Sequence, residues 1–162
     1  MKTLTPKQLK EIGDKIPLGS TYDANGNELT FKNSNGYWEE RTYDANGNEL
    51  TFKDSSGYCY ERTYDANGNE LTYKTSNGYW YERTYDAKGN ELTSKDSSGV
   101  NRIALARDPE YTLWYDLDSE HYIAGCRNFA NAKDALKHWK RKDKRAVIFT
   151  KAIEKHMRAI DE

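Results

Sequence analysis

Between residues 21 and 106, aromatic or apolar positions alternate with polar ones in short runs, a pattern typical of half-buried β-strands. Two such runs, 27–32 and 37–43, are rich in Thr, Tyr, Trp and Phe, which favour extended backbone. They are followed by the turn sequences Asn33-Ser34-Asn35-Gly36 and Asp44-Ala45-Asn46-Gly47. Glycine after Asn or Ser supplies the positive φ that tight hairpin turns need. The pattern therefore predicts antiparallel strands joined by tight turns.

This pair of strands recurs along the chain. The dipeptide Tyr-Asp occupies positions 22–23, 43–44, 64–65 and 85–86, which is a period of 21 residues. The last of the four units is degenerate, with Ser94 and Val100 at positions that are aromatic in earlier units. Terminal repeats commonly diverge in this way because one side meets a cap instead of another repeat. We expect a meander of about eight short strands over residues 21–106.

The odd period constrains the turns. Side chains alternate between the two faces of a strand, so two identical turns per repeat would reverse the sheet at every unit. A three-residue loop at 34–36 combined with a two-residue type I′ loop at Asn46-Gly47 avoids the reversal. This assignment puts an aromatic stripe on one face: Leu29, Phe31, Tyr37, Arg41 and Tyr43, with Tyr60 and Tyr81 where the first unit has Glu39. The other face is mostly polar: Glu28, Thr30, Lys32, Trp38, Glu40 and Thr42.

Both faces offer candidate binding residues. The aromatic stripe is either core, covered by curling of the sheet, by the C-terminal helices or by a second copy, or it is a recognition surface. Trp38 and Trp80 occupy equivalent positions on the polar face, and Trp is enriched at binding hot spots. Alternatively, each indole lies flat over neighbouring Thr and Lys side chains. Our candidates for partner binding are Trp38, Trp80, Tyr60 and Tyr81.

The segments that flank the repeats predict helices. Residues 1–20 are expected to form an N-terminal helix or cap, and residues 107–162 a small ββαα unit. That unit combines a hairpin of 111–116 and 121–126 with helices that begin near Asn131 and at Asp143. The predicted apolar stripes of the helices are Ala132, Ala135, Leu136 and Trp139, and then Ala146, Phe149, Ile153, Met157 and Ile160. The predicted fold class is α+β, an antiparallel β-meander of four 21-residue hairpin repeats followed by the ββαα unit.

Composition narrows the class of protein. Aromatic residues make up 13% of the 162 residues, which argues against disorder. No apolar run is long enough for a membrane span, and the N-terminus lacks the apolar core of a secretory signal, so a soluble cytoplasmic protein is expected. The run Asp-Ala-Asn-Gly-Asn-Glu does not match a calcium loop, because its glycine is fourth instead of sixth.

No catalytic constellation stands out. The three histidines show no metal-ligand spacing, and no glycine-rich phosphate loop is present. Cys126 is the one tempting nucleophile, with His121 or His138 as base, but a buried small residue explains it better. We therefore expect a protein that is not an enzyme and has no cofactor or metal.

Charge is distributed unevenly although the formal net charge of the whole chain is only −1. Residues 127–162 hold 11 Lys and Arg against 5 Asp and Glu, whereas residues 21–100 hold 8 against 14. The densest basic cluster could contact phosphates; it consists of Lys140, Arg141, Lys142, Lys144 and Arg145. The near-neutral chain argues against nucleic acid as the main partner, and an exposed helix corner is the simpler interpretation.

Two resemblances extend this picture. The motif Tyr-Asp-Ala-Asn-Gly-Asn-Glu-Leu-Thr resembles the YD repeat of RHS and teneurin-type proteins, whose hairpin sheets curl into shells. Four units are too few for a shell, so the cargo-enclosing role is not implied. The string Ala124-Gly125-Cys126-Arg127, with Phe129 and His138-Trp139, resembles a small C-terminal domain of uncharacterised phage and prophage proteins.

These observations favour a non-enzymatic interaction protein, phage- or prophage-borne, that binds a host protein complex through its repeats. The expected role is an inhibitor or adaptor, for example of a host defence system. Glycan or small-ligand recognition by the aromatic hairpins and nucleic-acid binding by the basic helices are the alternatives. Homodimerisation through the aromatic face also stays open.

Overall fold

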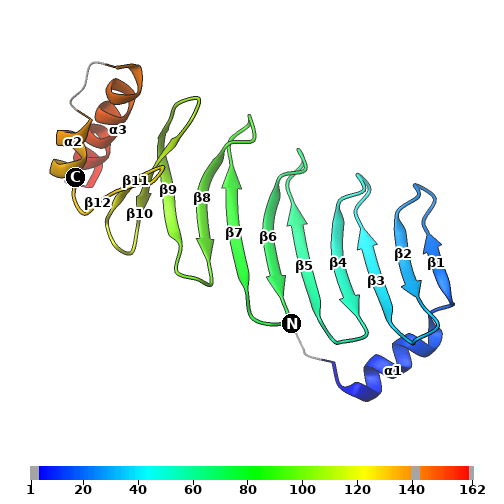
Figure 1. The fold of residues 1–162 in the computed structure, drawn as a ribbon. Helices are drawn as coiled ribbons and strands as arrows, with labels where there is room; N and C mark the ends of the chain where they lie inside the picture. Colours follow the sequence, from blue (N-terminus) through cyan, green and yellow to red (C-terminus); the bar gives the residue numbers. More distant parts are fainter. Residues whose placement is uncertain (1–3, 140–142, 161–162) are drawn as a thin grey trace. The chain divides into compact units, whose positions relative to one another are not determined.

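The computed structural model describes residues 4–139 and 143–160, which form three helices and twelve strands. The strands follow one another in sequence order in one antiparallel sheet (Figure 1). The strands are β1 (Gly19–Tyr22), β2 (Glu28–Lys32), β3 (Trp38–Tyr43), β4 (Glu49–Asp54), β5 (Cys59–Tyr64), β6 (Glu70–Thr75), β7 (Trp80–Tyr85), β8 (Glu91–Asp96), β9 (Asn101–Arg107), β10 (Thr112–Asp116), β11 (Tyr122–Ala124) and β12 (Arg127–Phe129). The helices are α1 (Pro6–Lys15), α2 (Ala132–His138) and α3 (Lys144–Ile160). The predicted α+β class and the antiparallel meander are confirmed.

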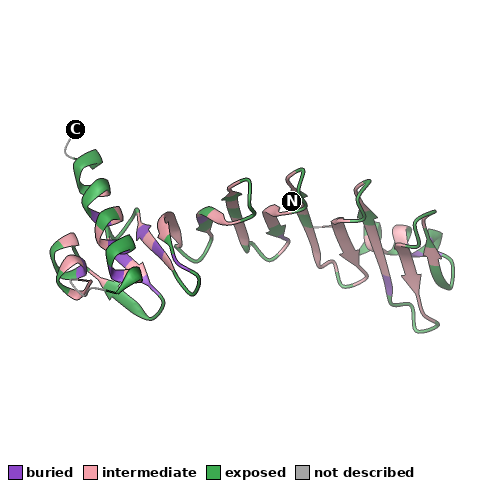
Figure 2. Ribbon diagram, turned by 90° about the horizontal axis from the view of Figure 1, so that it is seen from above, coloured by how far each residue is buried: buried purple, intermediate pink, exposed green. Residues whose placement is uncertain are grey.

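The chain divides into two compact units, which are described separately. The first contains the chain up to Arg83 together with Asp96–Ser98. The second contains Thr84–Lys95 and the chain from Gly99 onward. In Figure 2 the strands of the first unit are mostly half-buried, and buried residues gather in the second.

Both turns of a repeat have the same geometry. The amide of Gly36 donates to the carbonyl of Asn33 at 3.2 Å, and that of Gly47 donates to the carbonyl of Asp44 at 3.1 Å. In each case the glycine has the positive φ, 87° and 84° respectively, and closes a three-residue loop. The two-residue type I′ turn predicted at Asn46-Gly47 is therefore wrong.

A β-bulge in each repeat provides the offset that the odd period requires. On β3 and β4, Thr42 pairs with Thr51, whereas the next residue, Tyr43, pairs with Glu49, so Leu50 is an extra residue. The same shift follows Thr21 and Thr63. The bulge also turns the glutamate at the start of the strand toward the aromatic face. Glu28, predicted on the polar face, instead binds Arg41 on the aromatic one.

Helix α1 packs against the polar face of the first unit. Thr5 and Gln8 form a capping box at its start, and Pro6 occupies its first turn. The backbone of Gly13 lies against the indole of Trp38, so closely that a Cβ on Gly13 would be 2.5 Å from Nε1 of Trp38. Lys32 Nζ donates to the Gly13 carbonyl at 2.6 Å. The helix thus covers the part of the sheet that contains Trp38.

The second unit has its own hydrophobic core. Phe149 and Ile153 of α3 and Ala135 of α2 are fully buried in one cluster with residues of β10 and β11, namely Leu113, Tyr115, Tyr122 and Ala124. As predicted, the side chains of Asn131 and Asp143 cap the two helices by accepting backbone N–H bonds.

One end of the predicted α3 stripe is not buried. Met157 is 37% exposed and Ile160 is 60% exposed, whereas Ala146, Phe149 and Ile153 of the same stripe are fully buried. The buried part of the stripe, which ends at Ile153, belongs to the core cluster, and the last turn of α3 extends beyond that cluster.

Candidate interaction surface on the repeats

The aromatic face of the first unit carries a tract of rings that is continuous from Phe52 to Tyr81, together with the separate pair Phe31 and Tyr37; we call these rings the tyrosine face. Its members are Phe31, Tyr37, Phe52, Tyr58, Tyr60, Tyr73, Tyr79 and Tyr81. Ring centroids of successive strands are 5.1 Å apart for Phe52 and Tyr60, 5.3 Å for Tyr60 and Tyr73, and 5.4 Å for Tyr73 and Tyr81. These distances are typical of favourable aromatic pairs, so the rings hold one another in place.

Arginines are interleaved with the rings. The guanidinium carbon of Arg62 lies 4.5 Å from the ring centre of Tyr60, and that of Arg83 lies 4.1 Å from Tyr81. Both distances are within the range of cation–π contacts. One Arg per repeat therefore stacks on the tract and limits the freedom of the tyrosines beneath it.

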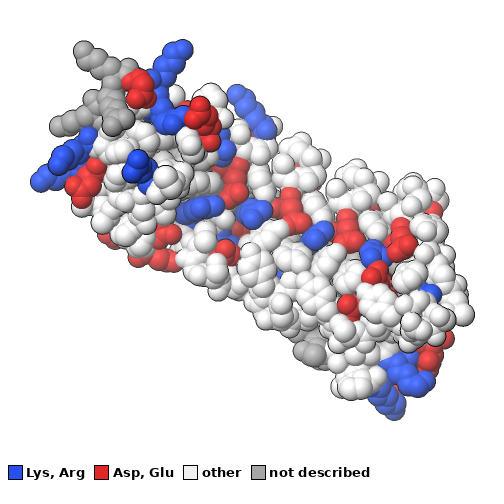
Figure 3. Space-filling view, in the orientation of Figure 1, with Lys and Arg blue, Asp and Glu red and all other residues white. Residues whose placement is uncertain are grey.

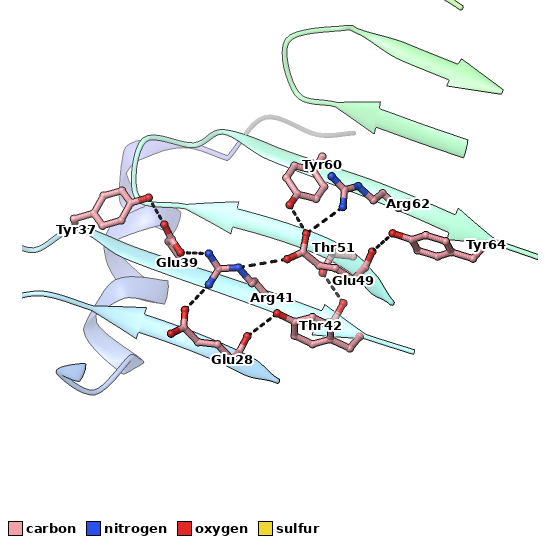
Figure 4. Close-up of polar contacts among 11 residues, drawn as sticks. Glu28, Tyr37, Glu39, Arg41, Thr42, Glu49, Thr51, Tyr60, Arg62 and Tyr64 are labelled. Atoms are coloured by element: carbon pink, nitrogen blue, oxygen red, sulfur yellow. Dashed lines mark hydrogen bonds and ion pairs between the residues drawn. The ribbon is translucent and has the colours of Figure 1, made fainter. Parts of the chain in front are cut away.

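Glutamates complete a polar network on this face. Arg41 binds Glu28 at 2.6 Å, contacts Glu39, and lies 3.4 Å from Glu49 (Figure 4). The Glu49 carboxylate also accepts from the Tyr60 hydroxyl. Figure 3 shows the molecular surface, on which acidic and basic groups alternate among uncharged atoms over the strands of the first unit.

Three phenols of the face, those of Tyr37, Tyr60 and Tyr73, have raised pKa values and stay neutral. The hydrogen bond to Glu39 raises the pKa of Tyr37 to about 12, and burial together with the Tyr58 hydroxyl raises that of Tyr73 to about 12. Burial, and then the Glu49 carboxylate, also raises the pKa of Tyr60. Tyr37 and Tyr79 are 36% and 41% exposed, so their rings and hydroxyls are accessible to a partner.

The predicted candidates separate onto the two faces. Tyr60 and Tyr81 lie on the tyrosine face, where both contact Tyr73. Trp80 pairs with Lys74 on the opposite face and is half-buried. The expectation of an exposed Trp pair is wrong for Trp38, which is only 3% exposed because α1 covers it.

Sequence reasoning missed several members of the face as candidates. Tyr58, Tyr73 and Tyr79 were not singled out, and neither were the stacked Arg62 and Arg83. The signal was present, because Arg recurs every 21 residues, two positions after Glu39, Tyr60 and Tyr81. In repeats of this kind, Tyr and Arg two positions apart on one strand therefore indicate Arg side chains stacked on an aromatic face.

The second unit contains a groove of about 700 Å³ between the start of β10 and the junction of α2 and α3. Cys126 lines it and is exposed, so the interpretation of Cys126 as a buried small residue is wrong. The reason is that Cys126 lies in the turn between β11 and β12.

The structure describes two of the five residues of the predicted basic cluster, Lys144 and Arg145. Arg145 binds Asp108 and Glu110, so its charge is already compensated. Lys144 is exposed and lines the groove. Lys140, Arg141 and Lys142 lie outside the described residues.

Among the described residues, no group of His, Cys, Asp and Glu is arranged to hold a metal ion. Among the same residues, no helix has the length and apolar character needed to cross a bilayer.

Comparison with known proteins gives a weak result. No protein-family model and no curated protein matches the chain. Among solved structures, it is similar to one described as the crystal structure of TcdB2-TccC3-TEV, with 20% identity and a TM-score of 0.34. The similarity covers 65% of this chain but spans only 7% of the other. A likeness at this level says nothing about function.

Proposed function

We propose that the chain is a non-enzymatic interaction protein that binds a protein partner through the tyrosine face. The observation that supports this most is the continuous tract of stacked Tyr and Arg side chains on the face opposite α1. Tyr and Arg are enriched at binding hot spots, because they combine large contact area with polar ends.

Rigidity supports the same proposal. Stacking and ion pairs already order these side chains in the free protein, so little conformational entropy is lost when a partner binds. The face is also broad, since its rings extend from β2 to β7, which suits a protein surface better than a small substrate. The phage-type resemblance of the C-terminal segment makes a bacterial host protein the partner class to test first.

The test is an affinity capture from bacterial lysate after nuclease treatment, with the bound proteins quantified by mass spectrometry. The double variant Tyr60→Ser/Tyr81→Ser removes two rings from the tyrosine face. Hot-spot residues contribute about 2 kcal/mol or more each, so we expect recovery of the partner to fall by well over tenfold.

A matched control uses the next residue of each strand. Glu61 and Glu82 are exposed on the opposite face, and Glu61→Gln/Glu82→Gln should retain the partner. Circular dichroism melts of both variants verify folding. If the glutamate variant loses the partner and the tyrosine variant keeps it, the binding face is assigned incorrectly. Capture that disappears on nuclease treatment would instead favour nucleic acid.

A further inference from the structure

Helix α1 shows what the polar face of the repeats can bind. The Gly13 backbone fits against the Trp38 indole with no room for a side chain, and Lys32 donates to the Gly13 carbonyl. On the same side of the helix, Leu9 reaches the turn at Gly57, where a Cβ would lie 3.4 Å from its methyl group. Ile16, just after the helix, is buried. The spacing of 9 and 13 places Leu9 and Gly13 on one face of the helix.

The features that receive α1 recur two repeats later. Lys74 pairs with Trp80 across β6 and β7, as Lys32 pairs with Trp38 across β2 and β3. Beside each pair, two threonine hydroxyls are hydrogen-bonded at 2.6 Å, Thr21 to Thr30 and Thr63 to Thr72. The arrangement of Lys, Trp and Thr side chains at the site that binds α1 is thus present a second time on this face.

The second copy of this site is open. Trp80 lines a groove of about 410 Å³ together with Glu61, Thr63, Thr72, Tyr73, Lys74, Tyr81 and Glu82. The described part of the first unit contains a single helix, α1, and it lies at Trp38. Trp80 is half-buried, whereas Trp38 under its helix is 3% exposed.

We propose that the Trp80 groove binds an amphipathic helix of a partner protein, with a glycine against the indole as Gly13 lies against Trp38. One difference between the Trp80 groove and the site at Trp38 determines which charge that helix should carry. Opposite Lys74 stands Glu61, whereas opposite Lys32 stands Gly19. The additional carboxylate, which lines the groove together with Glu82, selects a helix that carries Lys or Arg beside its apolar stripe. This site lies on the face opposite the tyrosine face and does not depend on the proposed function.

The probe is a peptide of residues 4–18, the segment that contains α1. A lactam bridge between the exposed Lys7 and Glu11 fixes it as a helix, so failure to bind cannot be attributed to an unfolded peptide. It is titrated into the full chain, and the indole N–H signals of the four Trp residues are followed by NMR. Trp→Phe variants assign each signal.

We expect the Trp80 signal to shift and saturate at one peptide per chain, while the Trp38 signal stays in place. A Gly13→Ala peptide should bind about tenfold more weakly, since the added methyl overlaps the indole. Alanine is the better helix former, so that loss cannot come from helix propensity.

Two protein variants complete the test. Trp80→Ala should abolish saturable binding, measured by calorimetry, and Tyr79→Ser should preserve it, because Tyr79 is adjacent to Trp80 but packs on the tyrosine face and does not line the groove. The inference is overturned if the bridged peptide leaves the Trp80 signal unmoved, if it shifts only Trp38 by displacing α1, or if the Gly13→Ala peptide binds equally well. The two sites are distinguished by their variants. Trp80→Ala should abolish peptide binding and leave capture of the lysate partner unchanged, whereas Tyr60→Ser/Tyr81→Ser should reduce capture of the lysate partner.

Discussion

At the scale of single residues, the aspartate of each Tyr-Asp pair organises the turn that follows it. Asp44 Oδ1 accepts the amides of Asn46 and Asn48 at 2.8 and 2.9 Å, and Oδ2 accepts the Asn48 side-chain amide at 2.9 Å. Asp23, Asp65 and Asp86 repeat this arrangement. The Asp-Ala-Asn-Gly-Asn motif is thereby explained as turn chemistry.

These carboxylates make stability sensitive to acid. Hydrogen bonds, first that of the asparagine side chain, lower the pKa of Asp23, Asp44, Asp65 and Asp86. A lowered pKa in the folded state contributes stability above the unfolded value of about 3.9, and this contribution is lost as the pH falls through the folded pKa. A variant with all four aspartates changed to Asn should therefore lose less stability than the wild type between pH 7 and pH 3. Urea unfolding at each pH measures it, and parallel curves for the two proteins would contradict the assignment.

At the scale of elements, a helix and a strand meet through a glycine. The contact of Gly13 with Trp38 joins α1 to the sheet, and the hydrogen bond from Lys32 fixes the same point of the helix. A small residue is required there, because the indole occupies the space of a side chain.

Replacing this glycine tests the contact. Gly13→Leu improves helix propensity but overlaps Trp38, and we expect a net destabilisation of about 1–3 kcal/mol by urea unfolding. Tryptophan fluorescence should shift to longer wavelength as the indole gains contact with water. In a Trp38→Ala background, Gly13→Leu should lower the free energy of unfolding by less, because the indole that overlaps the new side chain is absent. Additive effects of the two substitutions would mean that the contact is not what limits this position.

At the scale of the whole molecule, the repeat period predicts most of the architecture. The spacing of the Tyr-Asp pairs correctly predicts consecutive antiparallel strands and an aromatic face that contains Phe31, Arg41 and Tyr60. The bulge at Leu50 could not be predicted, since Asn46-Gly47 suits either a two-residue or a three-residue loop. Both a two-residue loop without a bulge and a three-residue loop with a bulge satisfy the odd period. The first places Glu28 on the polar face, and the second places it on the aromatic face.

Burial of the Trp residues shows the limit of a repeat-based prediction. Trp38 and Trp80 occupy equivalent positions, yet a helix outside the repeats covers only the first of them. That difference depends on a contact between distant parts of the chain. Local pattern carries no information about such a contact, although a glycine inside a helix, here Gly13 in the last turn of α1, can indicate close packing.

The period itself can be tested by deletion. Removing residues 44–64 deletes one repeat and joins Tyr43 to Asp65, so each side chain in the strands that follow stays on the same face of the sheet. Removing 45–64 leaves one extra residue and works against the register of the strands that follow. We expect the first variant to unfold cooperatively with somewhat lower stability, and the second to unfold at a clearly lower urea concentration. Equal midpoints would show that register is not set by the period.

The most direct test of the tyrosine face is site-specific photocrosslinking in bacterial cells. Tyr79 is replaced by p-benzoylphenylalanine, an aromatic residue that fits this exposed position of the face. The control carries the same residue at Ala66, which is exposed in a turn of the same unit. We predict an adduct with one partner protein from position 79 and none from position 66. No adduct from position 79, or the same adduct from both positions, would contradict the proposal that the tyrosine face binds the partner.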